Sequence, residues 1–240
     1  MILLQDMMDF FEILAPSHSA EKWDPVGLQV GDPRQSIHSV ALSLDIDLPC
    51  IQFLKTQTVD LVITHHPLFF KPLNSLLFNS EMDQILSVLL QKRCAVLSHH
   101  TNLDKAKGGI NDSFCNAYGF DPALGTSIGF LKVLQNSAHT LHSLEKILPC
   151  ISYDYHHGPI HQIGFCAGSA HGVMKDVLKS DIQCLITGEL THHDLVSCQF
   201  QKISVITVGH HASEIIGLRR LSSLIKTQFP SLRLLSDLLY

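Results

Sequence analysis

Short apolar runs of strand length alternate along the chain with longer segments of helical periodicity. After an amphipathic first helix and a loop over 23–33, the first half predicts strands at 39–45, 59–64 and 94–98 and helices at 48–56, 81–92 and about 110–118. The second half predicts strands at 129–134, 161–167, 184–187, 203–208 and 232–235 and helices at 143–148, 173–180, 192–199 and 212–227. This alternation predicts an α/β fold with mixed sheets flanked by helices.

The pattern changes register around 121–126, where a linker is plausible. We therefore expect two interlinked α/β lobes, an N-terminal lobe of residues 1–122 and a C-terminal lobe of residues 123–240, both of which contribute to the site. No repeat of 20–50 residues, the period typical of solenoids, is evident.

Composition excludes several classes of protein. The longest apolar runs fall far short of the ~20 residues that a membrane-spanning helix needs. The N-terminal segment carries Asp6, Asp9 and Glu12 and has no basic region, unlike a signal peptide. A formal charge of −5 argues against a nucleic-acid partner. We expect a cytoplasmic protein with no membrane partner.

The seven cysteines are widely spaced, mostly in apolar stretches, and form no CxxC motif. This pattern is typical of buried free thiols, and it favours neither disulfides nor thiolate zinc sites.

Sixteen histidines are the unusual feature of the composition. Neutral imidazole is the commonest metal ligand in proteins, so metal binding is the first hypothesis. Ten of the histidines form adjacent pairs: His65-His66, His99-His100, His156-His157, His192-His193 and His210-His211. The pair at 156–157 and the single residues His139, His142 and His171 do not follow a predicted strand, and we expect most of these to be solvated.

Four polar clusters directly follow predicted strands. Ligand sites of α/β sheets form beyond the carboxyl ends of the strands, so we expect these clusters to share one region. The clusters are His65-His66, the segment 99–102, the segment 187–189 and Gly209-His210.

Each cluster also has a simpler interpretation. A histidine pair can be incidental, and Glu214 can serve the helix dipole, although it follows His210 by four residues and would share its helix face. Asp104 is either a ligand or a turn cap. Glu189 and His192 are candidates for supporting a ligand or for acid–base catalysis, while Thr191 is expected to cap a helix with Asp194 at its third position.

Taken together, three imidazoles and two carboxylates at strand exits match a mixed nitrogen and oxygen site for divalent ions. Five ligands for two ions leave open positions, which favours catalysis or substrate capture. The absence of cysteine ligands disfavours a structural zinc site. The five residues are His65, His66, Asp104, His210 and Glu214.

Six motifs in order along the chain resemble those of the Nif-three-like family, many of whose members carry the name GTP cyclohydrolase I type 2 homolog. They are Trp23-Asp-Pro-Val-Gly-Leu-Gln-Val-Gly-Asp32, Ile63-Thr-His-His-Pro-Leu-Phe-Phe70, His100-Thr-Asn-Leu-Asp104, Gly108-Gly-Ile-Asn-Asp112, Ile186-Thr-Gly-Glu-Leu-Thr-His-His-Asp194 and Gly209-His-His-Ala-Ser-Glu214.

The resemblance implies two divalent metal ions per subunit, such as zinc, manganese or iron, held by His65, His66, Asp104, His210 and Glu214. It also implies a toroidal homohexamer of the short form, without an inserted domain. Two functions follow as hypotheses: a metal-dependent hydrolase of a nucleotide-like small molecule with Glu189 and His192 as catalytic residues, or a ring-shaped metal carrier or scaffold without turnover. No P-loop is present to hold a triphosphate.

Overall fold

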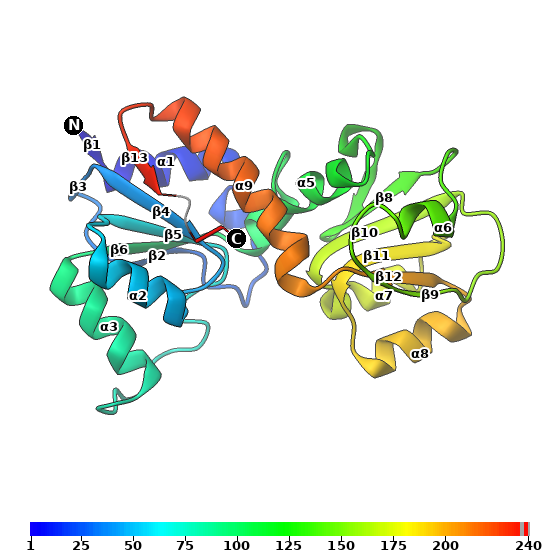
Figure 1. Cartoon of the computed structure of the whole chain (residues 1–240), viewed down its shortest axis with the longest axis horizontal. Coiled ribbons are helices and arrows are strands. Elements are labelled where there is room, and N and C mark those ends of the chain that lie inside the picture. The colour runs from blue at the N-terminus through cyan, green and yellow to red at the C-terminus, as the bar shows by residue number, and fades with distance from the viewer. Residues whose placement is uncertain (236–237, 240) are drawn as a thin grey trace. The chain divides into compact units, whose positions relative to one another are not determined.

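The computed structural model describes residues 1–235 and 238–239, and it divides into two compact units (Figure 1). Unit 1 comprises Met1–Leu103 together with Leu218–Tyr240, and unit 2 comprises Asp104–Gly217. These boundaries differ from the sequence-based division after residue 122. One reason is that strand β13 (Arg233–Leu235) pairs in parallel with β4 (Ser39–Ser43) and so joins the sheet of unit 1.

Unit 1 is built on a five-stranded sheet of order β13-β4-β5-β6-β2. Strands β13, β4, β5 and β6 run parallel, and β2 joins the edge in the antiparallel direction. The further strands of this sheet are β5 (Leu61–Thr64), β6 (Ala95–Ser98) and β2 (Gly27–Val30); β1 (Ile2–Leu3) and β3 (Ser36–Ile37) form a separate two-stranded sheet.

Helices cover the sheet of unit 1. Helices α2 (Leu48–Thr56) and α3 (Glu81–Lys92) form one hydrophobic core with alternate strand residues such as Ala41, Val62 and Val96. Their starts are set by side-chain caps: Asp47 Oδ1 accepts from the backbone N–H of Cys50 at 2.9 Å, and Ser80 caps α3 in the same way. Helices α1 (Leu4–Leu14) and α4 (Thr101–Lys105) complete the helices that begin in this unit.

Unit 2 is built on a six-stranded sheet of order β7-β8-β10-β11-β12-β9. The three central strands β10 (Gln162–Ser169), β11 (Cys184–Glu189) and β12 (Ser204–Thr207) run parallel. The outer strands are antiparallel to their neighbours: β7 (Thr126–Ile128), β8 (Leu131–Gln135) and β9 (Ile151–Tyr153).

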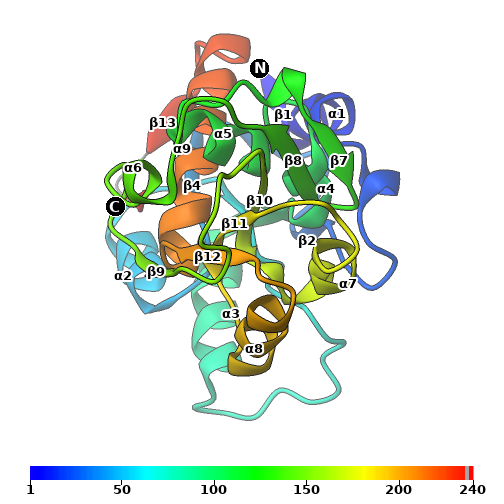
Figure 2. The same cartoon turned by 90° about the vertical axis from the view of Figure 1, so that its right-hand side faces the viewer.

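Helices also pack on the sheet of unit 2. Figure 2 shows this unit facing the viewer. Helices α7 (Met174–Val177) and α8 (His192–Phe200) share a core with β11 through residues such as Val177, Leu185 and Cys198. Helix α5 (Ile110–Ala117) places Phe114 edge-on against Phe165 of β10, with ring centroids 6.0 Å apart. The short α6 (Leu141–Leu144) and the first residues of α9 (His210–Gln228) complete the unit.

The predicted α/β fold with mixed, helix-flanked sheets is confirmed. Two predictions within it are wrong. The segment 23–33 is not all loop, because β2 pairs there with β6, and the helix expected at 143–148 lies earlier because Thr140 caps it by accepting from Ser143 N. All seven cysteines are free, as expected, and all but Cys150 are buried. Among the described residues, no helix has the length and apolarity needed to cross a bilayer.

Candidate metal centre

Three histidines converge at the carboxyl ends of two neighbouring parallel strands in unit 1. His65 and His66 follow β5, and His100 follows β6 by two residues. One potential ligand atom from each of these histidines lies within 4.8 Å of those from the other two. We call these three residues the histidine cluster.

The hydrogen bonds of the cluster decide which imidazole nitrogen is available to an ion. His65 Nδ1 donates to the carbonyl of His99 at 3.0 Å, and His66 Nδ1 donates to Asp45 Oδ1 at 2.9 Å. His100 Nδ1 donates to Asp24 Oδ1 at 3.1 Å. Because a carbonyl and a carboxylate only accept, each Nδ1 carries a hydrogen, and Nε2 is therefore the nitrogen that would bind a metal ion. This is the arrangement in which protein histidines usually bind metal.

Two carboxylates accept hydrogen bonds from the histidine cluster. The side chain of Asp24 is fully buried, whereas that of Asp45 is 55% exposed. Asp24 also accepts hydrogen bonds from the backbone N–H and the hydroxyl of Thr101. Burial raises the pKa of Asp24, but the hydrogen bonds from His100 and Thr101 outweigh it and hold the pKa below its usual value. Asp24 therefore remains an anion that fixes the ring of His100.

The neighbouring His99 has a different role. Its ring is buried and stacks on Phe11 with centroids 4.0 Å apart, and its Nδ1 accepts from Asn102 Nδ2 at 2.9 Å. Burial lowers the pKa of His99 to about 3, so the ring is neutral. The pair His99-His100 thus divides into a core residue and a potential ligand.

In unit 2, His210 and Glu214 occupy the first turns of α9, as their spacing of four predicted. His210 Nε2 lies 3.2 Å from Glu214 Oε1, and Glu214 is buried. His210 Nδ1 donates to Glu189 Oε1 at 3.1 Å. Glu189, the last residue of β11, therefore orients His210 as the acidic residues of unit 1 orient their histidines. We call His210 and Glu214 the helix pair.

The close approach of α9 to the sheet of unit 2 depends on small residues. A Cβ added to Gly188 would lie 2.6 Å from Ser213 Oγ and 2.9 Å from the Cα of His210. Gly168 adopts a left-handed φ of 62°, which favours glycine, and donates from its N–H to Ser213 Oγ at 2.8 Å. These contacts fix where the helix pair lies relative to the strand ends.

Asp104 and His192 are the predicted site residues that remain to be placed. Asp104 lies in α4, and its charge and that of Glu214 add to the burial that raises the pKa of Cys166. His192 is the exposed first residue of α8, and its ring lies against His193 with centroids 5.8 Å apart. Thr191 caps α8 by accepting from Asp194 N at 3.2 Å, as expected.

His100, Asp24 and Asp45 were missed by the sequence-based site assignment. The position of His100 after a strand was a usable signal, because His65-His66 was selected on the same ground. Nothing in the local pattern marks Asp24 or Asp45 as partners of histidines, since both contacts join segments far apart in the sequence.

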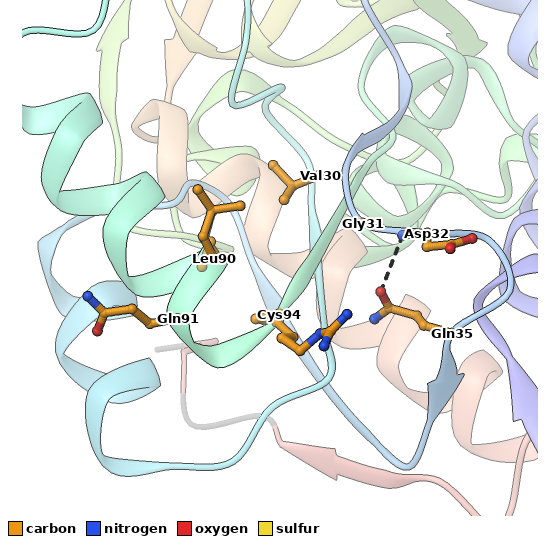
Figure 3. Close-up of a pocket in the computed structure, with 9 residues that line it drawn as sticks. Val30, Gly31, Asp32, Gln35, Leu90, Gln91 and Cys94 are labelled. Carbon is orange, nitrogen blue, oxygen red and sulfur yellow. Dashed lines mark hydrogen bonds between the residues drawn. The ribbon is translucent and has the colours of Figure 1, made fainter.

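Two of the cavities in the described structure are lined by residues other than the histidine cluster. A cavity of 630 Å³ in unit 1 is lined by residues including Val30, Gln35 and Cys94, and none of its described lining residues is a histidine (Figure 3). Burial raises the pKa of the Cys94 thiol to about 12, which makes it a poor nucleophile. A second cavity, in unit 2, borders Glu189 and has mostly apolar walls. Its volume of 450 Å³ suits a small molecule.

The chain is similar to several known proteins. The profile of the family described as Duf34/NIF3 (NGG1p interacting factor 3) matches residues 2–236. A Helicobacter pylori protein named GTP cyclohydrolase 1 type 2 is 33% identical over 223 residues, which cover 89% of this chain and 88% of that protein. NIF3-like protein 1 of Drosophila melanogaster is 28% identical over 221 residues, covering 85% of this chain and 75% of that protein.

The fold is also found among solved structures. Reduced HcgD from Methanocaldococcus jannaschii superposes with a TM-score of 0.84 over 98% of this chain and 97% of its own, at 23% identity. A structure described as protein ybgI, of unknown function, gives a TM-score of 0.86 over 98% of this chain and 97% of its own, at 18% identity. At these identities the likeness shows the fold alone.

Proposed function

This chain belongs to the Duf34/NIF3 family, and we propose that it is a cytoplasmic protein with two divalent metal ions that hydrolyses a nucleotide-like small molecule. The proposed ligands are the five residues predicted from the sequence: His65, His66, Asp104, His210 and Glu214. We add His100, because it belongs to the histidine cluster. The name GTP cyclohydrolase 1 type 2, carried by relatives, supports a nucleotide as the substrate class.

The observation that carries the proposal is a hydrogen-bonding pattern that four histidines share. In His65, His66, His100 and His210, Nδ1 donates to a carbonyl or carboxylate oxygen, so Nε2 is the ring nitrogen that would bind an ion. In His210 this nitrogen faces Glu214 Oε1, the other proposed ligand atom of the helix pair, at 3.2 Å. An exposed histidine such as His171 makes a similar contact with Asp194 at 3.0 Å, so the proposal rests on the combination of these contacts with the convergence of the histidine cluster at the strand ends. The donor set of imidazoles and carboxylates suits zinc, manganese or iron, so the residues fit the group that the family resemblance implies.

Divalent ions held by these residues would act as Lewis acids toward a substrate oxygen and lower the pKa of a nucleophilic water. The chain itself would supply orientation, because Asp24, Asp45 and Glu189 fix the rings of three histidines. Glu189 is half-exposed and borders the 450 Å³ cavity of unit 2, so it can also exchange a proton with a molecule bound there.

One observation favours a second candidate, a ring-shaped homohexameric metal carrier or scaffold without turnover. Glu189 Oε1 already accepts from His210 Nδ1, and the ring of His192 lies against His193. Both candidate acid–base residues therefore have structural contacts. In this candidate the same ligands bind the ions and no proton transfer is needed.

The two candidates are separated by turnover in metal-replete protein. We expect hydrolysis of at least one compound from a panel of nucleotides, pterins and phosphoesters, and loss of that activity in His66→Ala. The matched control is His142→Ala, because His142 is exposed and lies on a short helix away from the strand ends. Absence of turnover across the panel, with the ions bound and a hexameric mass in solution, would favour the carrier.

A further inference from the structure

Two large aromatic side chains of unit 1 stand half-exposed beside the histidine cluster. The rings of Trp23 and Phe70 lie 5.6 Å apart, inclined at 48°. Each also approaches the imidazole of His100, with centroid distances of 6.0 Å for Trp23 and 6.3 Å for Phe70. We call Trp23 and Phe70 the aromatic pair.

Hydrogen bonds of the flanking chain hold the aromatic pair in place. Asp24, the residue after Trp23, is anchored by its three bonds to His100 and Thr101. Gln29 then joins the two segments that carry the rings: its Nε2 donates to the carbonyl of Pro25 at 2.6 Å, and its Oε1 accepts from the N–H of Phe69 at 3.0 Å. The rings are therefore positioned before any ligand arrives.

The exposed parts of the two rings form a surface that a ligand can cover. Trp23 is 55% exposed and Phe70 is 50% exposed, so about half of each side chain is accessible to a ligand. An exposed, prearranged aromatic surface next to candidate metal ligands suits a molecule with two parts. One part is a flat ring that stacks, and the other carries oxygen atoms suited to the ions.

We propose that the aromatic pair stacks the planar heterocyclic ring of the substrate, with a purine-type base as the class. This inference rests on the proposed function, which supplies the substrate class. Stacking on tryptophan and phenylalanine suits a nucleobase because every base presents a π-face. Trp23 and Phe70 are thereby specificity-determining residues, distinct from the ligands and from Asp24.

The chain offers a direct probe, because Trp23 is its single tryptophan. Fluorescence excited at the red edge of indole absorption therefore reports this ring alone. We expect saturable quenching when zinc-loaded protein is titrated with guanosine monophosphate, and no saturable change with ribose phosphate, which carries the sugar and phosphate without the base. Equal responses to both, or no saturable response to guanosine monophosphate, would overturn the inference.

Substitution of the second ring gives an independent check. We expect Phe70→Leu to weaken the binding of guanosine monophosphate roughly tenfold, within the range measured for lost base–aromatic stacking. Phe78→Leu is the matched control, since Phe78 lies in the same loop and is 88% exposed. Equal effects of the two substitutions would contradict stacking at Phe70. A changed oligomeric mass of Phe70→Leu in light scattering would instead assign the pair to a contact between copies, and would also overturn the proposal.

Metal content and turnover measured on the same samples separate this inference from the proposed function. Saturable, base-dependent quenching without hydrolysis would support the stacking site and remove the hydrolase. Hydrolysis of a nucleotide without such quenching would support the hydrolase and remove the stacking site.

Discussion

His100 Nδ1 lies 3.1 Å from Oδ1 of Asp24, and this contact joins two segments that are 76 residues apart in the sequence. The carboxylate is buried and also accepts from the backbone and hydroxyl of Thr101. It therefore fixes both the ring orientation of His100 and the start of the helix that follows it. Groups that orient metal-binding histidines typically change metal affinity when they are replaced.

Replacing Asp24 with asparagine is expected to weaken zinc binding by about 10- to 100-fold, the usual effect of losing such a partner. The amide keeps the shape of the side chain but removes the charge that supports the Nδ1 hydrogen of His100. Zinc affinity is measured by competition with a chromophoric chelator. Asp32→Asn is the control, because Asp32 is an exposed carboxylate paired with Arg34. Unchanged affinity in Asp24→Asn would argue against His100 as a ligand.

Glu189 should affect metal binding through its hydrogen bond to His210. Glu189→Gln retains an oxygen acceptor for Nδ1, whereas Glu189→Ala removes it, so metal affinity is expected to fall in the order wild type, Gln, Ala. The alanine variant is expected to bind about 10- to 100-fold more weakly. Glu81→Ala, at the exposed first turn of α3, serves as the control.

Turnover measured beside metal content in Glu189→Gln tests whether Glu189 transfers a proton. If Glu189→Gln retains both ions and loses turnover, the carboxylate acts as an acid or base as well as an orienting group. His192→Gln is expected to leave metal content unchanged, because the described ring contact of His192 is with His193. A loss of metal in His192→Gln would contradict this assignment.

His99 predicts a specific dependence of stability on pH. Burial lowers its pKa to about 3, whereas the unfolded chain titrates near the ordinary value of about 6.5. As the pH falls through this interval, only the unfolded state takes up the proton. The free energy of unfolding therefore falls below about pH 6.5 by up to about 1.4 kcal/mol per pH unit from this residue.

The measurement is urea unfolding of wild type and His99→Phe, which retains a flat ring against Phe11. Between about pH 7.5 and about pH 5.5, where an ordinary histidine titrates, wild type is expected to lose more stability than the variant. His142→Phe is the control because His142 is exposed. Parallel pH profiles of wild type and His99→Phe would show that His99 is not neutral and buried in solution.

The cysteines predict a simple labelling pattern. Six thiols are buried, and burial raises the pKa of Cys50 and Cys115 to about 12, so these groups are both inaccessible and protonated. A thiol reagent is expected to label Cys150 alone in native protein. Its rate should increase with pH, because burial and the charge of Glu145 raise the pKa of Cys150. Rapid labelling in Cys150→Ser would contradict the described packing.

Much of the fold follows from local sequence. Helices α2 and α3 have the predicted bounds because a capping side chain precedes an amphipathic segment in each case. Strands β5 and β6 are short apolar runs between helices, the pattern of buried parallel strands. Strand β2 was missed because its residues are only partly buried and its pairing with β6 is a long-range contact at a sheet edge.

In the site, too, local relations were predictable from the sequence and long-range contacts were not. The i,i+4 relation of His210 and Glu214 is local, and α9 bears it out. The contacts of Asp24 with His100 and of Asp45 with His66 depend on how the strands are ordered in the sheet, which a single sequence does not reveal. The roles of Asp104 and of the complete ligand set remain predictions from the family resemblance.

The count of metal ions per protomer tests the central claim most directly. Wild-type protein purified without added metal is analysed by elemental mass spectrometry. Three variants are measured in the same way: His66→Ala from the histidine cluster, Glu214→Ala from the helix pair, and His38→Ala as an exposed control. About two ions are expected in wild type and in His38→Ala, as the family resemblance implies, with substantial loss in both other variants. A wild-type protein that contains no ion and takes up neither zinc nor manganese when they are added would contradict the account.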